Sequence, residues 1–184
     1  MRIAICGAGS TGKTTLSKKL LDEPLIKQLN LKSIDVDARR IIDAMHHMNI
    51  DNMTCEERIA FQREYAATKI ALEENETDYI TQRSFVDIAA YWVVRDAVNE
   101  TIQFKQEMID LCRKWAMRYD KHIFIPFGQI PIEFDGYRSL DTAQYYAVSE
   151  KIEWYLNEWK IGYHRISSAN LCQRIESAKA YILK

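Results

Sequence analysis

The feature that most constrains this chain is a glycine-rich stretch near its amino terminus, GAGSTGKT, at residues 7–14. A short apolar run precedes it, and Leu16 and Leu20 follow it at the spacing of a helix face. A strand, a glycine-rich turn and a helix in this order aim backbone N–H groups at an anion, because a helix dipole is positive at its N-terminal end. The stretch therefore predicts a phosphate-binding loop made of Gly7, Ala8, Gly9, Ser10, Thr11, Gly12, Lys13, Thr14 and Thr15.

Two side chains of this loop suit a nucleoside triphosphate. Lys13 can reach the β- and γ-phosphates, and the Thr14 hydroxyl can bind the Mg²⁺ that bridges them. The sequence contains no Asn/Thr-Lys-x-Asp stretch, which is the guanine motif of GTPases, and 184 residues are few for a motor ATPase. We therefore expect ATP and Mg²⁺ as cofactors of a kinase or an ATPase.

The remaining sequence alternates between short apolar runs and longer helix-periodic stretches. This alternation is typical of an α/β fold, with a five-stranded parallel sheet flanked by helices. We expect the strands at residues 2–6, 32–35, 78–82, 122–126 and 162–166. Because 47% of the 184 residues are hydrophobic, the whole chain, residues 1–184, suits one domain.

Two helix starts can be identified from capping boxes, in which a hydroxyl and a carboxylate three residues apart satisfy backbone donors. Thr54 with Glu57, and Ser84 with Asp87, have this spacing. Two buried helix faces are expected from apolar residues at intervals of three and four. The residues of these faces are Phe61, Tyr65, Thr68 and Leu72, and Val148, Ile152, Tyr155 and Trp159.

The second predicted strand ends in the sequence SIDVDARR. A carboxylate at the carboxyl end of a parallel strand faces the ligand crevice, so Asp37, in preference to Asp35, is predicted to orient an acceptor hydroxyl. The neighbouring Arg39 and Arg40 slightly favour an acceptor that already carries a phosphate. In the alternative interpretation, Asp37 caps a helix and the two arginines are solvated.

The third predicted strand is followed by QRSFVDIAAYW. Arg83 is predicted to project from the strand end toward phosphates held by the glycine-rich loop. Asp87 has two interpretations of equal weight, a functional carboxylate or only the capping partner of Ser84.

A long stretch rich in Gly, Pro and Asp separates the last two predicted strands, and we expect a lid at about residues 127–141. Arg138 lies on this glycine-hinged segment and is a candidate lid arginine that would reach the transferred phosphoryl group and help to exclude water. The alternative is an exposed arginine near Asp135 or Asp141.

Net charge and hydropathy limit the kinds of partner that we expect for this protein. Lys plus Arg, at 25, nearly cancel Asp plus Glu, at 26, so the net charge of −1 does not favour nucleic acid as a partner. No apolar run approaches the roughly 20 residues of a membrane helix, and the start does not resemble a signal peptide, so we expect a cytoplasmic protein. The four histidines lack the spacing of metal ligands. A homodimer is compatible with the sequence.

The motifs GAGSTGKTTL, DVDARR, QRSFVDIAAYW and DGYRSLD, in this order, resemble the P-loop nucleoside and nucleotide kinases. They are most similar to small AAA-type ATP-binding proteins related to ribosylnicotinamide kinase, over nearly the whole chain. The resemblance implies a P-loop NTPase fold in which Lys13 and Thr14 serve ATP and Mg²⁺. It further implies that Asp37 lies near the acceptor hydroxyl, that Arg83 belongs to an Asp/Glu-Arg-Ser motif, and that Arg138 is the lid arginine.

The sequence departs from this family at one position. Members carry Asp or Glu before the Arg-Ser pair, near Mg²⁺ or its waters, whereas this chain has Gln82. An amide can bond a metal-bound water but adds no negative charge. Weaker Mg²⁺ binding, or compensation by Asp37 or Asp78, would follow.

Together these patterns predict an ATP-dependent kinase acting on a nucleoside, a nucleoside monophosphate or a related small molecule. The predicted catalytic residues are Lys13, Asp37, Arg83 and Arg138. Two alternatives stay open. One is a kinase for a hydroxymethylated base in DNA, which would need a local basic groove. The other is an ATP-binding regulatory module with slow hydrolysis, which Gln82 favours.

Overall fold

The computed structural model describes residues 1–47, 49–132, 136, 139 and 141–184. Its centre is a sheet of five strands in the order β2-β3-β1-β4-β5, with every neighbouring pair parallel. The chain moves outward from β1 to β2 and later crosses β1 to form β4 and β5. The loop after β1 therefore emerges at the point where the strand order reverses, which is where ligands bind in open α/β sheets.

The five predicted strands are confirmed, with small changes at their ends. The strands are β1 (Arg2–Cys6), β2 (Lys32–Ile34), β3 (Tyr79–Gln82), β4 (Lys121–Phe124) and β5 (Tyr163–Arg165). The α-helices are α1 (Lys13–Asp22), α2 (Pro24–Lys27), α3 (Ala38–Ala44), α4 (Cys55–Glu73), α5 (Phe85–Tyr91), α6 (Ile102–Ala116), α7 (Thr142–Glu158) and α8 (Leu171–Ile182). A short 3₁₀ turn, η1 (Ile50–Asn52), precedes α4, and a π-helical turn, η2 (Trp92–Asp96), continues α5.

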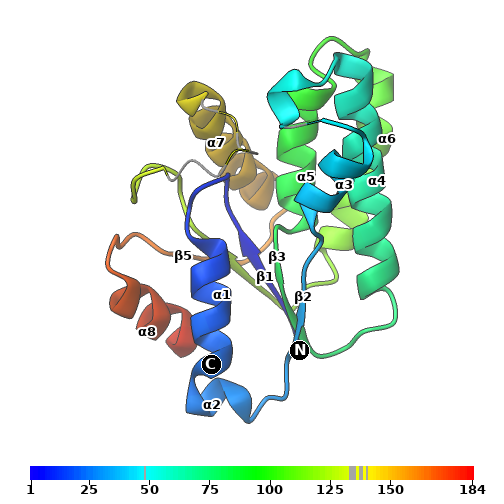
Figure 1. The fold of residues 1–184 in the computed structure, drawn as a ribbon. Helices are drawn as coiled ribbons and strands as arrows, with labels where there is room; N and C mark the ends of the chain where they lie inside the picture. Colours follow the sequence, from blue (N-terminus) through cyan, green and yellow to red (C-terminus); the bar gives the residue numbers. More distant parts are fainter. Residues whose placement is uncertain (48, 133–135, 137–138, 140) are drawn as a thin grey trace.

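Helices cover both faces of the sheet (Figure 1). Side chains alternate along a strand, so Ile3 and Ile5 of β1 face one layer while Ala4 and Cys6 face the other. The first layer contains α1, α2 and α8, and Leu16 is completely buried there. The second contains α4, α5, α6 and α7, which form the larger apolar core. Ala8 of the phosphate loop belongs to this second core.

Both predicted capping boxes are present. Thr54 and Glu57 exchange backbone and side-chain hydrogen bonds at the start of α4, and Ser84 and Asp87 do so at the start of α5. The predicted face of α7 is also confirmed, since Val148 and Ile152 are completely buried. Local signals of this kind suffice because the partners lie within one or two helical turns.

The predicted inner face of α4 is wrong in its second half. Phe61 and Tyr65 are buried, but Leu72 is 44% exposed. The buried positions that follow are Lys69 and Glu73, at 0% and 1% exposure, and these two side chains form an ion pair of 2.6 Å. A buried charge is stable only when it is paired and hydrogen-bonded, and an apolar pattern cannot reveal such a pair.

Among the helices of the described ranges, none is both long enough and apolar enough to cross a bilayer.

Candidate active site

The phosphate loop lies between β1 and α1 and is shaped by close backbone contacts. A Cβ atom on Gly7 would lie 2.6 Å from the carbonyl oxygen of Ile125, so only glycine fits. The Lys13 ammonium folds back over the loop and donates to the carbonyl oxygens of Gly7 at 2.7 Å and Ala8 at 2.5 Å. The loop thus holds its own cation in place beside the amides that precede α1.

Two side chains of α5 hold the loop from outside. Asp87 is completely buried, and its carboxylate accepts the Gly7 N–H at 2.7 Å and the Ser84 N–H at 2.8 Å. One turn later, the Tyr91 hydroxyl accepts the Gly9 N–H at 2.9 Å. Burial raises the pKa of Asp87, and the positive charge of Lys13 opposes that rise. Asp87 is therefore more than a capping partner, because it also fixes the first residue of the loop.

Gly9 is also closely packed on a second side. A Cβ atom there would lie 2.7 Å from the ring of Tyr145 on α7, so the loop passes close to this aromatic side chain. The Tyr145 hydroxyl donates to the carbonyl oxygen of Ser139 at 2.9 Å. Gly9 thereby lies between Tyr91 of α5 and Tyr145 of α7.

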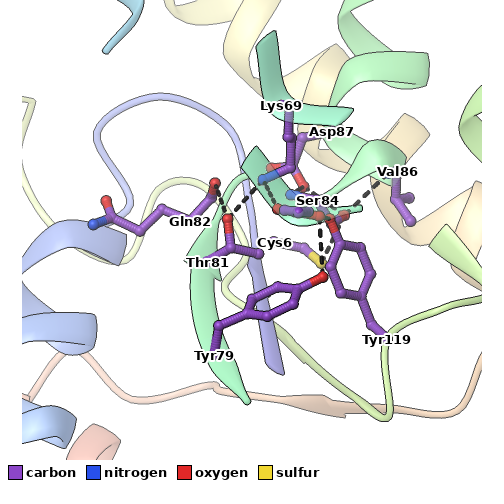
Figure 2. A network of polar contacts seen from close by, with 10 residues as sticks. Cys6, Lys69, Tyr79, Thr81, Gln82, Ser84, Val86, Asp87 and Tyr119 are labelled. Atoms are coloured by element: carbon purple, nitrogen blue, oxygen red, sulfur yellow. Dashed lines mark hydrogen bonds and ion pairs between the residues drawn. The ribbon is translucent and has the colours of Figure 1, made fainter. Parts of the chain in front are cut away.

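A buried polar network supports the end of β3 and the start of α5 (Figure 2). The Lys69 ammonium donates to the Thr81 hydroxyl at 2.6 Å, beside its ion pair with Glu73. The other Glu73 oxygen accepts the hydroxyl groups of Tyr79 and Tyr119, at 3.2 and 2.8 Å. Breaking one member of such a network leaves a buried group unpaired, so the network holds this strand end rigidly.

Gln82, at the end of β3, contacts the loop directly. The Thr14 hydroxyl donates to the Gln82 side-chain oxygen at 2.5 Å, and Gln82 is only 7% exposed. The Thr14 oxygen keeps its lone pairs for another ligand while it gives its proton to the amide. The unusual residue of the resemblance therefore lies beside the predicted metal ligand, as a neutral acceptor.

A cavity of about 840 Å³ runs along the carboxyl edge of the sheet. The phosphate loop lines one part of it, and Asp35, Asp37 and Arg39 line another. Phe61 and Tyr65 add an aromatic wall. The cavity thus joins the predicted polyphosphate site to a second compartment with acidic, basic and aromatic groups.

Two aspartates near the end of β2 have different surroundings. The Asp37 side chain accepts the backbone N–H groups of Arg39 and Arg40, at 3.1 and 3.3 Å, so it caps α3 as the alternative interpretation expected. The protein around Asp35 partly desolvates its carboxylate and raises the pKa, while Lys69, Arg83 and Lys13 act in the opposite direction. Asp35 therefore lies in the positive field of the cavity.

Arg83 lines the cavity at the strand end where the sequence predicted it. Its backbone is left-handed, with φ of 56°, and its guanidinium carbon lies 5.8 and 5.7 Å from the ring centroids of Tyr65 and Tyr91. A non-glycine residue in this conformation is strained and is frequent at functional sites. The two aromatic faces hold the cation between them.

The π-helical turn η2 adds a residue that the sequence analysis missed. Arg95 lines the cavity, lies 4.6 Å from the Tyr91 ring centroid and pairs with the buried Asp96 at 2.5 Å. π-helical turns are rare and are frequently found at functional sites. No signal in the sequence distinguishes such a turn from a continuous helix.

The lid prediction lies partly outside the described residues, because Arg138 and Asp135 are not among them. Of the predicted lid, the described Ile130, Pro131 and Ser139 line the cavity. Within the described part of the chain, no group of three or more His, Cys, Asp or Glu side chains could hold a metal ion.

Comparisons with known proteins agree with this geometry. No curated protein matches the sequence. Among solved structures, deoxyadenosine kinase from M. mycoides with bound dATP is similar with a TM-score of 0.69 and 15% identity, over 100% of both chains. The NadR protein in complex with NR is similar with a TM-score of 0.63 and 18% identity, over 98% of this chain and 51% of NadR.

These likenesses confirm the P-loop fold of the nucleoside kinases that the sequence predicted. The chain spans about half the length of NadR. A family model described as an AAA domain matches residues 2–174, which is nearly the whole sequence. The chain belongs to this AAA domain family and has a P-loop nucleoside-kinase-like fold.

Proposed function

We propose that this protein is an ATP-dependent kinase that phosphorylates a hydroxyl group of a nucleoside or a related small molecule. The observation that carries the proposal is the 840 Å³ cavity, which continues from the phosphate loop to Asp35 and the aromatic wall. A hydrolase needs room only for water beside the terminal phosphate, whereas this volume suits a donor and an acceptor together. The dATP and NR bound in the similar structures support the same class of ligand.

Asp35 is proposed as the group that orients the acceptor. Its carboxylate accepts the proton of the acceptor hydroxyl while the hydroxyl oxygen forms a bond to the γ-phosphorus and the bond from that phosphorus to ADP breaks. Desolvation by the cavity walls raises the pKa of Asp35 and makes it a better proton acceptor. Asp37 was the residue that the sequence favoured, but its side chain already accepts two backbone N–H groups.

The positive groups of the site are proposed to stabilise the transferred charge. Lys13 and the loop amides would hold the β- and γ-phosphates, and Arg83 would face the transferred group from the acceptor side. The Thr14 hydroxyl fits Mg²⁺, because its proton is already donated to Gln82 and its oxygen can serve as a ligand. When bound, Mg²⁺ would neutralise phosphate charge.

The second compartment suggests the shape of the acceptor. Phe61, Tyr65 and Tyr91 offer aromatic surface, and Ile42 and Ile50 add apolar surface to the same cavity. Aromatic and apolar walls suit a flat nucleobase, and Arg95 offers hydrogen-bond donors at its edge. A nucleoside is therefore favoured over a sugar or an amino alcohol.

The proposal is tested by ATP turnover against nucleosides, nucleoside monophosphates and short single-stranded DNA. Lys13→Ala should lose at least about 100-fold in kcat, since Lys13 contributes charge at the reacting phosphates. Lys18→Ala, which removes an exposed lysine of the same helix, should leave turnover unchanged.

The outcomes separate the candidate activities. Turnover that depends on one nucleoside supports the proposal and identifies the acceptor. ATP binding without stimulation by any acceptor would contradict it and would favour a regulatory ATP-binding module. ATP turnover that is stimulated by DNA alone would instead support a kinase that acts on a base within a DNA strand.

A further inference from the structure

One buried charge in α8 has no acidic partner in the part of the chain that the structure describes. Arg174 is 2% exposed, and its guanidinium contacts three neutral oxygens. Nε donates to the Ser168 carbonyl at 2.5 Å, one terminal nitrogen to the Thr11 carbonyl at 2.8 Å, and the other to the Gln129 side-chain oxygen at 3.0 Å. Among the described residues, no carboxylate pairs with it.

An unpaired buried cation is costly, so its position needs an explanation. Burial lowers the pKa of Arg174, yet a guanidinium stays protonated at any physiological pH. Its three hydrogen bonds go to neutral oxygens, so they do not compensate its charge. No anion that would do so is present among the described protein residues, but Arg174 contacts the phosphate loop, which is the predicted anion site.

The contact with Thr11 has a direct geometric consequence. The Thr11 carbonyl and the Gly12 N–H belong to one trans peptide unit, so they point in opposite directions. Because Arg174 donates a hydrogen bond to the Thr11 carbonyl, the Gly12 N–H points away from Arg174. In the described part of the chain, this N–H donates to no protein acceptor, and Gly12 lines the cavity. No side chain of the described residues caps the start of α1 at Gly12.

The same contact strengthens the donor. A charge-assisted bond to the carbonyl polarises the whole peptide unit, and linked hydrogen bonds reinforce one another in a low-dielectric setting. Gly12 cannot easily be replaced, because its φ is 83° and a Cβ atom would lie 3.0 Å from Arg174. The contact between Arg174 and the Thr11 carbonyl thus leaves a polarised Gly12 N–H at the start of α1.

We propose that Arg174 is a positioning residue for the phosphate donor: it aims the Gly12 N–H at the polyphosphate and supplies a buried positive charge that the bound anion compensates. The inference deepens the proposed function and depends on ATP binding at the loop. Through Gln129 and Ser168, Arg174 also joins the loop to the segments after β4 and β5.

The test measures the dissociation constant of Mg·ATP by calorimetry, and competition by inorganic tripolyphosphate, for wild type and Arg174→Met. We expect both ligands to bind about tenfold more weakly to the variant, as for the loss of one charge-assisted hydrogen bond. The control is Lys179→Met, which removes a cation of the same helix that pairs instead with Glu23 and Glu176. It should bind both ligands as wild type does.

A merely structural role of Arg174 predicts another pattern. If the substitution only loosened the segment after β5, the affinity for ATP would fall while the affinity for tripolyphosphate would not, and that result would overturn the inference. Unchanged affinity for both would do the same. If Arg174→Met does not fold, Arg174→Lys decides: it keeps the charge but cannot keep all three contacts, and we expect about threefold weaker binding of both ligands. Wild-type affinity in Arg174→Lys would overturn the inference.

The proposed function can fail separately. If the wild-type protein binds neither ATP nor tripolyphosphate, the proposed function itself is wrong. If the wild-type protein binds both ligands and Arg174→Met binds them equally well, only the proposed role of Arg174 is wrong.

Discussion

The stability of this protein should fall in mild acid because of one buried histidine. His122 on β4 is 2% exposed, and its Nε2 finds no hydrogen-bond partner among the described residues. Its ring meets the Tyr119 ring edge-on, with centroids 5.3 Å apart. Burial lowers the pKa of His122 from 6.5 to about 4, because the charged imidazolium would lose its hydration there.

The sign and the magnitude follow from this lowered pKa. Between pH 6.5 and about 4 the unfolded chain binds a proton at His122 and the folded chain does not, so stability is lost as the pH falls through this window. One pKa unit corresponds to about 1.4 kcal/mol, so the loss approaches about 3 kcal/mol by pH 4. Above pH 6.5 the residue has no effect on stability.

Urea unfolding of wild type and His122→Phe between pH 7.5 and 4, in steps of about half a pH unit, measures this loss. The Phe variant keeps a ring against Tyr119 but cannot titrate. Contributions of the carboxylates cancel in the difference between the two proteins. The wild type should lose about 3 kcal/mol more than the variant on acidification. Parallel profiles would refute the reasoning, since they would mean that His122 is hydrated or paired.

Three further predictions concern the site. Asp35→Asn should lower kcat by about 100-fold or more, and the rising limb of the wild-type pH profile should lie above the ordinary Asp pKa of 3.8. Asp37→Asn should keep both the helix cap and the activity, because Asn caps helices as well as Asp does. If instead Asp37→Asn loses activity and Asp35→Asn keeps it, Asp37 is the residue that orients the acceptor. Gln82→Glu should lower the half-saturating Mg²⁺ concentration several-fold by adding a negative charge beside Thr14, and an unchanged Mg²⁺ titration would place the ion elsewhere. Arg138→Ala should lower kcat by about 1,000-fold with ATP affinity mostly kept, and unchanged kinetics beside calorimetry would make Arg138 a surface residue.

The sheet and the loop could be predicted from the sequence because their signals are local. Glycines at set intervals before Lys13 indicate the tight backbone turn of a phosphate-binding loop. The capping box at Thr54 joins residues only three positions apart. The five strands appear as short apolar runs between helical stretches. Each signal needs a few neighbouring residues and no knowledge of what packs against them.

The groups that hold the loop could not be predicted in this way. Asp87 binds the amide of Gly7 across 80 positions of sequence, and Arg174 binds the Thr11 carbonyl across 163. The Lys69–Glu73 pair reads as an exposed helix pair until the partners on β3 and after α6 are in place. Long-range polar contacts of this kind have no periodicity, so they become visible only in the folded chain.

The sequence alone could not decide between Asp35 and Asp37, for a related reason. Both follow the second strand, and side-chain alternation places them on the same side. What separates them is the use of Asp37 by two backbone N–H groups of α3. Helix capping was weighed from the sequence, but the positive field around Asp35 depends on Arg83 and Lys69, which lie on other elements.

The position of Gly9 makes the two halves of the crevice mechanically dependent. Its amide is bonded to Tyr91, whose ring borders the acceptor compartment, and a side chain on it would collide with Tyr145, whose hydroxyl bonds Ser139. Both tyrosines therefore lie against the same glycine. If a ligand on one side moves its tyrosine, the affinity on the other side would change, and thermodynamic reciprocity would require an equal change in return. Order of substrate addition in this molecule would follow from the packing around one residue without a side chain.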